Sequence, residues 1–240
     1  MDLAAVPRIM VPSIHGTIMA EYLAFAVDST ALQNSASAAD LRHTWSRFPM
    51  TSQDSASKSQ STLPKTVVLV GLMGAGKTSV GRRLAEMFDS RFVDADKEIE
   101  QAAGCSIADF FDRFGEEEFR RGEERVIARL LRDPPCILAT GGGAFMSGDT
   151  RREIKDHGLS VWLKADLDVL FERVARRSDR PLLLTENPRA TLEAIMEQRY
   201  PVYAEADLTI DSYRGPIEQT VDRVHQKLLE YFTGAEGAIS

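Results

Sequence analysis

Two cysteines, four histidines and a shortage of basic residues set the first limits on this chain. Cys105 and Cys136 stand in unrelated contexts, and neither belongs to a C-x-x-C motif. We therefore expect buried free thiols, a reducing compartment and no structural zinc. Acidic residues outnumber basic ones by 36 to 29, which gives a net charge of -7. Because nucleic-acid binding usually requires a basic excess, we expect no nucleic-acid partner.

Long hydrophobic runs are also missing. No apolar stretch approaches the ~18 residues that a membrane-spanning helix needs. The best candidate, residues 18–27, is short and contains Glu21. It also lacks the basic flank and small-residue cleavage site of a secretory signal. We therefore expect a cytoplasmic protein without a membrane partner.

The composition changes near residue 63. Residues 30–62 are mostly Ser, Ala, Thr and Gln, and such a segment cannot bury enough apolar surface to offset its chain entropy. We expect an irregular or disordered extension over residues 1–62, with one short helix near residues 18–27. Two alternatives stay open: translation begins at an internal methionine such as Met50, or the segment is an organelle-targeting peptide, against which its acidic residues count. A folded domain is expected over residues 63–234, followed by a flexible tail at 235–240.

Strand and helix patterns alternate through this domain. Residues 66–70 form an apolar, β-branched run that is typical of a strand buried on both faces. The expected strands are 66–70, 91–94, 136–139, 160–163 and 208–210. The expected helices are 77–88, one near Ile99, 106–114, 116–131, one between the third and fourth strands, 167–176, 189–199 and 217–231. This alternation predicts an α/β fold with three layers, α/β/α, around a five-stranded parallel sheet, and ligands bind such sheets at the carboxyl ends of the strands.

A phosphate loop follows the first strand. Residues 71–78, G-L-M-G-A-G-K-T, match the pattern G-x-x-x-x-G-K-[ST] in full, directly before a helix. Glycines let backbone N–H groups converge on phosphate oxygens, and the helix N-terminus adds partial positive charge. We expect Lys77 to reach the β- and γ-phosphates and the Thr78 hydroxyl to bind Mg²⁺. The expected phosphate-binding residues are Gly74, Ala75, Gly76, Lys77, Thr78 and Ser79.

Five further motifs follow in an order that resembles the shikimate kinase family. They are F-V-D-A-D at 92–96, E-F-R-R-G-E at 118–123, A-T-G-G-G at 139–143, R-P-L-L at 180–183 and R-Y-P-V-Y at 199–203. With the phosphate loop, the ordered set covers residues 65–232. The resemblance implies a P-loop kinase fold with a mobile lid and a substrate-binding helical region. It also implies Mg²⁺-dependent transfer of the γ-phosphate of ATP to the 3-hydroxyl of shikimate, giving ADP and shikimate 3-phosphate for chorismate and aromatic amino acid biosynthesis.

The resemblance gives roles to two aspartates. Asp96 would bind the substrate hydroxyls and accept the proton of the attacking one, whereas Asp94 would hold Mg²⁺ through water. Both aspartates are expected in extended backbone at the end of the second strand, where one can serve the metal and the other the acceptor. The alternative is a helix N-cap or a solvated loop pair before the helix near Ile99.

The remaining roles also come from the resemblance. Arg120 and Arg199, on different predicted helices, would clamp the shikimate carboxylate, because a guanidinium can donate two parallel hydrogen bonds; surface ion pairs are the alternative. The backbone of Gly141, Gly142 and Gly143 would approach shikimate closely, with a plain tight turn as the alternative.

A lid is expected over the polar residues 178–188. Arg180 would join Lys77 and Asp96 as a catalytic residue by offsetting charge on the transferred phosphoryl group. Arg177 would contact adenine, although its neighbour Arg176 competes for that role.

Two other functions stay open. One is another small-molecule kinase, such as a gluconate or adenylate kinase, against which the combined D-x-D, F-R and glycine motifs argue. The other is a nucleotide-dependent regulatory protein, against which the presence of Asp96, Arg120 and Arg199 argues. The expected partners are ATP and shikimate, bound by a monomer.

Overall fold

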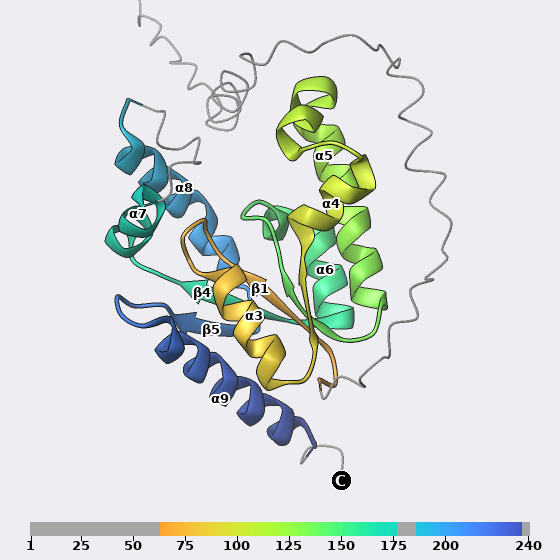
Figure 1. Ribbon diagram of the computed structural model, residues 1–240, viewed down its shortest axis with the longest axis vertical. Helices are drawn as coiled ribbons and strands as arrows, with labels where there is room; N and C mark the ends of the chain where they lie inside the picture. The colour runs from red at the N-terminus through yellow and green to blue at the C-terminus, as the bar shows by residue number, and fades with distance from the viewer. Residues whose placement is uncertain (1–62, 177–185, 237–240) are drawn as a thin grey trace, which may run out of the picture.

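The computed structural model describes residues 63–176 and 186–236. The predicted extension over residues 1–62, the arginines Arg177 and Arg180, and the last four residues lie outside the described residues. Figure 1 shows the described part as a central sheet with helices on both sides.

Five strands form the sheet, and every neighbouring pair is parallel. The strands are β1 (Thr66–Val70), β2 (Arg91–Asp94), β3 (Cys136–Ala139), β4 (Gly158–Lys164) and β5 (Leu208–Asp211). Their order is β2-β3-β1-β4-β5, which places β1 in the middle. Every residue of β1 is buried, as its run of β-branched residues without polar alternation predicts.

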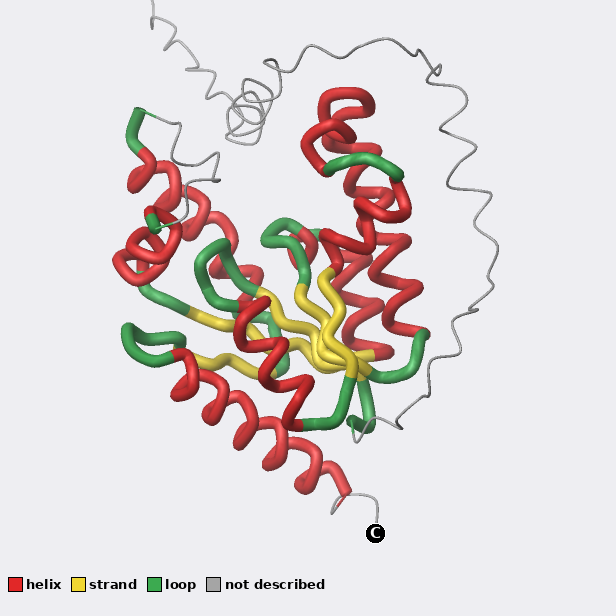
Figure 2. The backbone as a smooth tube through the Cα atoms, viewed as in Figure 1, coloured by secondary structure: helices red, strands yellow, loops and turns green. Residues whose placement is uncertain are grey.

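Helices cover both faces of the sheet, so the predicted three-layer α/β/α fold is confirmed (Figures 1 and 2). On one face, α3 packs against α9, and on the other α5 packs against α6. The helices are α3 (Lys77–Met87), α4 (Ala95–Ala103), α5 (Ile107–Arg132), α6 (Gly148–His157), α7 (Leu167–Ala175), α8 (Pro188–Tyr203) and α9 (Ile217–Glu236), with a short 3₁₀ turn, η2 (Ala144–Met146), after β3.

Helix α5 contains a kink where two separate helices are predicted. Gly115 has φ 77°, which glycine adopts without the steric penalty of a side chain. The two helical parts on either side agree with the predicted helices 106–114 and 116–131. The N-cap of the first part is Ser106, whose hydroxyl oxygen accepts a hydrogen bond of 3.1 Å from the Asp109 N–H and so pairs one of the free N–H groups of the first turn.

Two helices extend beyond their predicted ends. Helix α8 runs four residues past Arg199, although Pro201 lies inside it and cannot donate a backbone hydrogen bond. The last residue of α8, Tyr203, is fully buried, and burial of a large aromatic side chain offsets the cost of the proline. Helix α9 continues to Glu236 rather than ending at residue 231.

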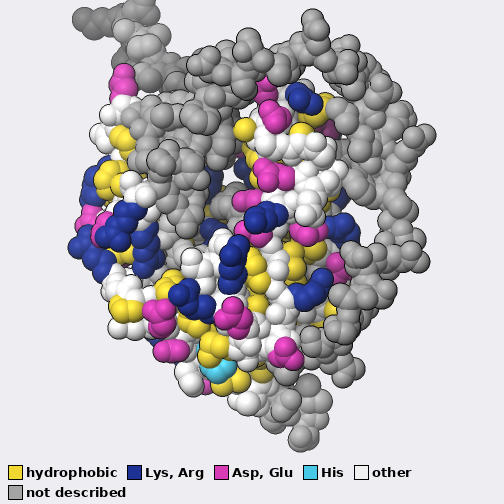
Figure 3. Space-filling model, viewed as in Figure 1, with side chains coloured by type: hydrophobic (Ala, Val, Ile, Leu, Met, Phe, Trp, Pro, Cys, Tyr) yellow, Lys and Arg dark blue, Asp and Glu magenta, His cyan; other side chains and the backbone are white. Residues whose placement is uncertain are grey.

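The surface carries charges of both signs. On the face seen in Figure 3, Lys and Arg side chains alternate with Asp and Glu and do not form one continuous basic surface. Among the described residues, no helix combines the length and the hydrophobicity needed to cross a membrane.

Candidate nucleotide and acceptor site

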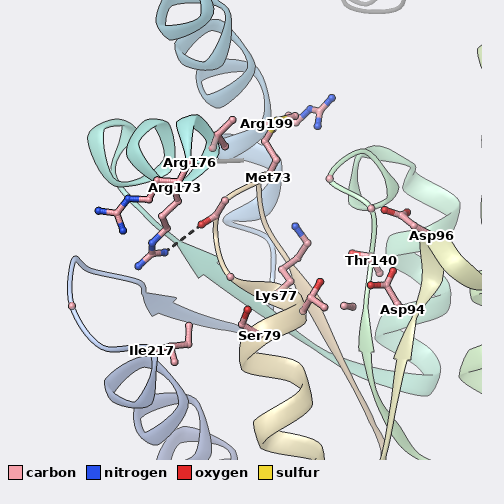
Figure 4. Close-up of a pocket in the computed structure, with 18 residues that line it drawn as sticks. Met73, Lys77, Ser79, Asp94, Asp96, Thr140, Arg173, Arg176, Arg199 and Ile217 are labelled. Carbon is pink, nitrogen blue, oxygen red and sulfur yellow. Dashed lines mark hydrogen bonds between the residues drawn. The ribbon is translucent and has the colours of Figure 1, made fainter. Parts of the chain in front are cut away.

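A cavity of about 600 Å³ opens at the carboxyl ends of the central strands (Figure 4). Its walls come from the β1–α3 loop, the ends of β2 and β3, helices α7 and α8, and the start of α9. Parallel strands bring their carboxyl ends to one edge of the sheet, so segments far apart in the sequence meet there.

The β1–α3 loop needs glycine at three positions. Gly71, Gly74 and Gly76 have φ values of 140°, 82° and 100°, a region that residues with a side chain rarely adopt. Gly71 also approaches β4 so closely that a Cβ would lie 2.8 Å from the Leu163 carbonyl oxygen. The loop leads directly into α3, whose N-terminus carries partial positive charge.

Lys77 is the first residue of α3, and its side chain lies over this loop. Its Nζ donates hydrogen bonds to the carbonyl oxygens of Gly71, at 2.7 Å, and Leu72, at 3.1 Å. Thr78 and Ser79, in the first turn of α3, line the same cavity. An ammonium, two hydroxyls and a helix N-terminus together suit a triphosphate.

Two residues that fit a magnesium ion also line the cavity, namely Thr78 in the first turn of α3 and Asp94 at the end of β2. Mg²⁺ usually takes only one or two protein ligands and completes its shell with water and substrate phosphates. The described residues contain no group of three or more His, Cys, Asp or Glu side chains that could hold a metal. A single hydroxyl with one nearby carboxylate fits Mg²⁺ bound mainly through a nucleotide.

Arg173, which has no role among the sequence predictions, joins the phosphate loop to the β5–α9 loop. Its guanidinium donates to the Gly74 carbonyl at 3.3 Å, to the Ser212 hydroxyl at 2.9 Å and to the Tyr213 carbonyl at 2.7 Å. Partial burial lowers its pKa. The sequence contained one indication that Arg173 faces the site: it precedes Arg176 by three positions, and residues three apart share a helix face.

Arg176, which competes with Arg177 for the predicted contact with adenine, lies at the rim of this cavity. It lines the cavity, is largely exposed, and pairs with Glu172 at 2.5 Å. Exposed pairs of this kind contribute little to stability, so Arg176 can exchange this partner for a ligand.

The backbone around Asp94 and Asp96 differs from the sequence prediction. Asp94 ends β2, but α4 begins at Ala95, so Asp96 lies in the first helical turn and not in an extended segment. An acidic residue is favourable there because it faces the positive end of the helix dipole. Asp94 takes the N-cap position but makes no side-chain capping hydrogen bond. Both aspartates line the cavity.

The glycine triplet is where the predicted acceptor residues meet. A Cβ on Gly141 would lie 2.7 Å from Asp96 Oδ1. A Cβ on Gly142 would lie 3.2 Å from Arg199 Nη1, and one on Gly143 would lie 2.5 Å from both terminal nitrogens of Arg120. Each glycine of the triplet therefore leaves room for a different polar side chain: Gly141 for Asp96, Gly142 for Arg199, and Gly143 for Arg120. The absence of side chains in the triplet is therefore a steric requirement of this site.

Arg120 is held within α5 by two acidic side chains. It pairs with Glu123 at 2.5 Å and with Glu116 at 3.4 Å. Burial disfavours the charged guanidinium, but Glu123 and Glu116 outweigh this effect and raise its pKa. Arg120 approaches Gly143 but does not itself line the cavity. Glu123, the buried acid of the F-R-x-x-E motif, received no role from the sequence and is the residue that orients Arg120.

Burial shapes the chemistry of Asp96. It raises the pKa of this carboxyl, and the negative charge of Asp94 raises it further, whereas Lys77 and Arg120 oppose the shift. A carboxylate with a raised pKa is a better proton acceptor than one fully exposed to water. Asp96 therefore combines access to the cavity with the properties of a general base.

Arg199 reaches the acceptor side from α8 (Figure 4). It is partly buried and lines the cavity, and its Nε is buried without a hydrogen-bond partner among the described residues. An unpaired donor at this position is costly unless a ligand accepts from it. Asp96 and Arg199 thus lie around one space beside the phosphate loop, with Arg120 behind Gly143.

Known proteins resemble this chain in sequence and structure. The family model for shikimate kinase matches residues 73–229. A shikimate kinase of Cereibacter sphaeroides is 57% identical over 166 residues, covering 69% of this chain and 83% of the relative. One of Paramagnetospirillum magneticum is 55% identical over 167 residues, covering 70% and 86%.

The solved structures agree. Shikimate kinase from Acinetobacter baumannii in complex with shikimate has a TM-score of 0.64 and 36% identity, covering 72% of this chain and 96% of that one. The enzyme from Bacteroides thetaiotaomicron has a TM-score of 0.64 and 30% identity, covering 69% and 98%. By its ordered motifs, its fold and its relatives, this chain belongs to the shikimate kinase family.

Proposed function

We propose that this protein transfers the γ-phosphate of ATP to the 3-hydroxyl of shikimate, giving ADP and shikimate 3-phosphate. The observation that carries the proposal is the glycine triplet, around which a carboxylate and two guanidinium groups gather beside a phosphate loop. Such a site suits an acceptor that has both hydroxyl groups and a carboxylate. The relative of known structure that was solved with shikimate supports this choice of acceptor.

The phosphate loop and Lys77 are proposed to hold the triphosphate. When ATP enters, its β- and γ-phosphate oxygens would replace the Gly71 and Leu72 carbonyls as acceptors for Lys77. Arg173 would keep the loop in place through the Gly74 carbonyl. Arg176, at the rim, is the described candidate for adenine, and Arg177 keeps its predicted role as the alternative.

Thr78 and Asp94 are the residues proposed to hold Mg²⁺, Asp94 through water. When bound, the ion would neutralise negative charge on the phosphate oxygens. Arg180, which lies outside the described residues, is proposed to offset negative charge on the transferred phosphoryl group.

Asp96 and the two acceptor arginines are proposed to orient shikimate. Arg120 and Arg199 would bind its carboxylate, while Asp96 would accept a hydrogen bond from the 3-hydroxyl and take its proton during transfer. The reaction is a direct displacement: the hydroxyl oxygen bonds to the γ-phosphorus as the bond to the β–γ bridging oxygen breaks, and ADP leaves. Its rate would come mainly from positioning and electrostatics.

A coupled ADP-release assay tests the proposal. The full chain is incubated with ATP and Mg²⁺ and with shikimate, a shikimate analogue that lacks the 3-hydroxyl, or gluconate. Of the three acceptors, we expect only shikimate to give ADP release above the acceptor-free background. NMR of the product should show a phosphate on the 3-position. Folded protein that is inactive with shikimate but active with gluconate would overturn the proposal.

We also propose that the protein is a monomer and acts in the cytoplasm, where ATP is available. Size-exclusion chromatography with light scattering measures the oligomeric state directly. A mass near the 26.6 kDa of one chain is expected.

A further inference from the structure

Behind the glycine triplet and Arg199, on the acceptor side of the cavity, lies a buried tyrosine that has no individual role among the sequence predictions. Tyr203 is the last residue of α8 and is fully buried. Arg199 precedes it by four positions, so the two side chains share one face of the helix. The Tyr203 hydroxyl donates a hydrogen bond to the carbonyl oxygen of Gly142. Helix α8 therefore reaches the middle of the glycine triplet through two residues.

Gly142 lies between these two side chains. A Cβ at this position would be 3.2 Å from Arg199 Nη1 and 3.9 Å from the Tyr203 hydroxyl oxygen. Burial raises the pKa of Tyr203, and the nearby Arg199 charge is the strongest opposing effect. The phenol thus keeps its proton at neutral pH and remains a hydrogen-bond donor to Gly142.

The tyrosine ring is fixed by other aromatic rings. Its centroid lies 6.0 Å from that of Trp162 in β4, 6.2 Å from that of Tyr200 and 6.3 Å from that of Phe145 in η2. Packing of this kind restricts the ring and therefore the position of its hydroxyl.

A fixed donor matters at this point because glycine backbone is otherwise adaptable. A peptide unit is planar, with its C=O and N–H directed oppositely. Holding the Gly142 carbonyl therefore also sets the direction of the Gly143 N–H. Arg199, which packs on the same glycine, is confined by the same arrangement.

We propose that Tyr203 is a positioning residue for the acceptor, which fixes the Gly142 peptide and the Arg199 guanidinium before shikimate binds. The inference rests on the proposed function, because it concerns the wall assigned to shikimate. Tyr203 acts through Gly142 and Arg199 and is not itself a catalytic residue.

The test compares two tyrosines of the same helix. Tyr203→Phe removes the hydroxyl bonded to Gly142, whereas Tyr200→Phe removes one that donates to the Ala165 carbonyl, away from the triplet. With one buried hydrogen bond lost, we expect Tyr203→Phe to raise the KM for shikimate about five- to tenfold. The KM for ATP should stay within about twofold of wild type. Tyr200→Phe should leave both KM values unchanged.

Thermal unfolding of both variants separates positioning from stability, since a purely structural role lowers Tm without separating the two KM values. An unchanged shikimate KM in folded Tyr203→Phe, or an equal rise in both variants, would overturn the proposal. If Tyr203→Phe does not fold, Gly142→Ala tests the other contact of the proposed arrangement, because its Cβ would lie 3.2 Å from Arg199 Nη1. A wild-type shikimate KM in that variant would also overturn it.

Wild-type enzyme is assayed first in the same series. Wild type that is inactive on shikimate refutes the proposed function, and the role of Tyr203 with it. Active wild type with an unaffected Tyr203→Phe variant refutes the role of Tyr203 alone.

Discussion

Replacement of Gly143 by alanine tests the acceptor site with a single methyl group. Gly143 has φ -92° and ψ -20°, which any residue adopts, so the change introduces no backbone strain. The new Cβ would lie 2.5 Å from both terminal nitrogens of Arg120 and 2.7 Å from its Cζ. Since ordinary contacts begin near 3.4 Å, the guanidinium must move by about 1 Å, which is the scale at which misplacement costs about 100-fold in function.

The expected effect is confined to the acceptor. Weakened hydrogen bonds to a charged group cost about 1.5–3 kcal/mol, which corresponds to a rise of about 10- to 150-fold in the KM for shikimate. The KM for ATP should not change, because Gly143 lies outside the phosphate loop. Stability should fall little, since the atoms that must move belong to the end of a flexible side chain.

The assay is coupled ADP release with each substrate varied in turn. Gly148→Ala is the matched control, because a Cβ there meets no atom within 4 Å, and it should leave both KM values unchanged. A folded Gly143→Ala variant with a wild-type shikimate KM would show that the position of Arg120 does not matter for the acceptor, and the carboxylate clamp would be wrong.

Three further predictions concern other parts of the site and the core. Asp96→Asn should lower kcat by at least about 100-fold. Because burial raises the pKa of Asp96, the ionised carboxylate destabilises the fold at neutral pH, and thermal scans should show the Asn variant to be the more stable protein there. This advantage should disappear as the pH falls through the raised pKa towards that of a free aspartate. In wild type, kcat should rise as the pH rises through the raised pKa of Asp96. If the pH dependence of kcat is the same in Asp96→Asn, Asp96 is not the group that accepts the proton. Arg173→Ala should raise the KM for ATP about tenfold by releasing the Gly74 carbonyl, and a selective rise in the shikimate KM would contradict it. Gly81→Ala would place a Cβ 2.6 Å from the Phe92 ring, so denaturant unfolding should show a loss of about 1–3 kcal/mol, and unchanged stability would show that the ring moves freely.

Local patterns in the sequence determined the fold class and the phosphate loop. A run of apolar residues such as 66–70 identifies a buried strand without knowledge of its neighbours, because burial on both faces excludes polar side chains. The phosphate loop is equally local: its glycines, Lys77 and Thr78 lie within one turn between a strand and a helix. The kink at Gly115 was predicted for the same reason, as a break between two helical patterns.

The tertiary structure alone decided how the acceptor side is built. Asp96, Gly142 and Arg199 come from three separate segments, and their proximity depends on the strand order β2-β3-β1-β4-β5, which no local pattern contains. The bond from Tyr203 to Gly142 spans 61 positions, and the contacts of Arg173 with the two loops likewise join distant segments. The raised pKa of Asp96 depends on burial by those segments. Periodicity and spacing act over a few residues, whereas contacts and desolvation arise only when the sheet brings remote residues to one edge.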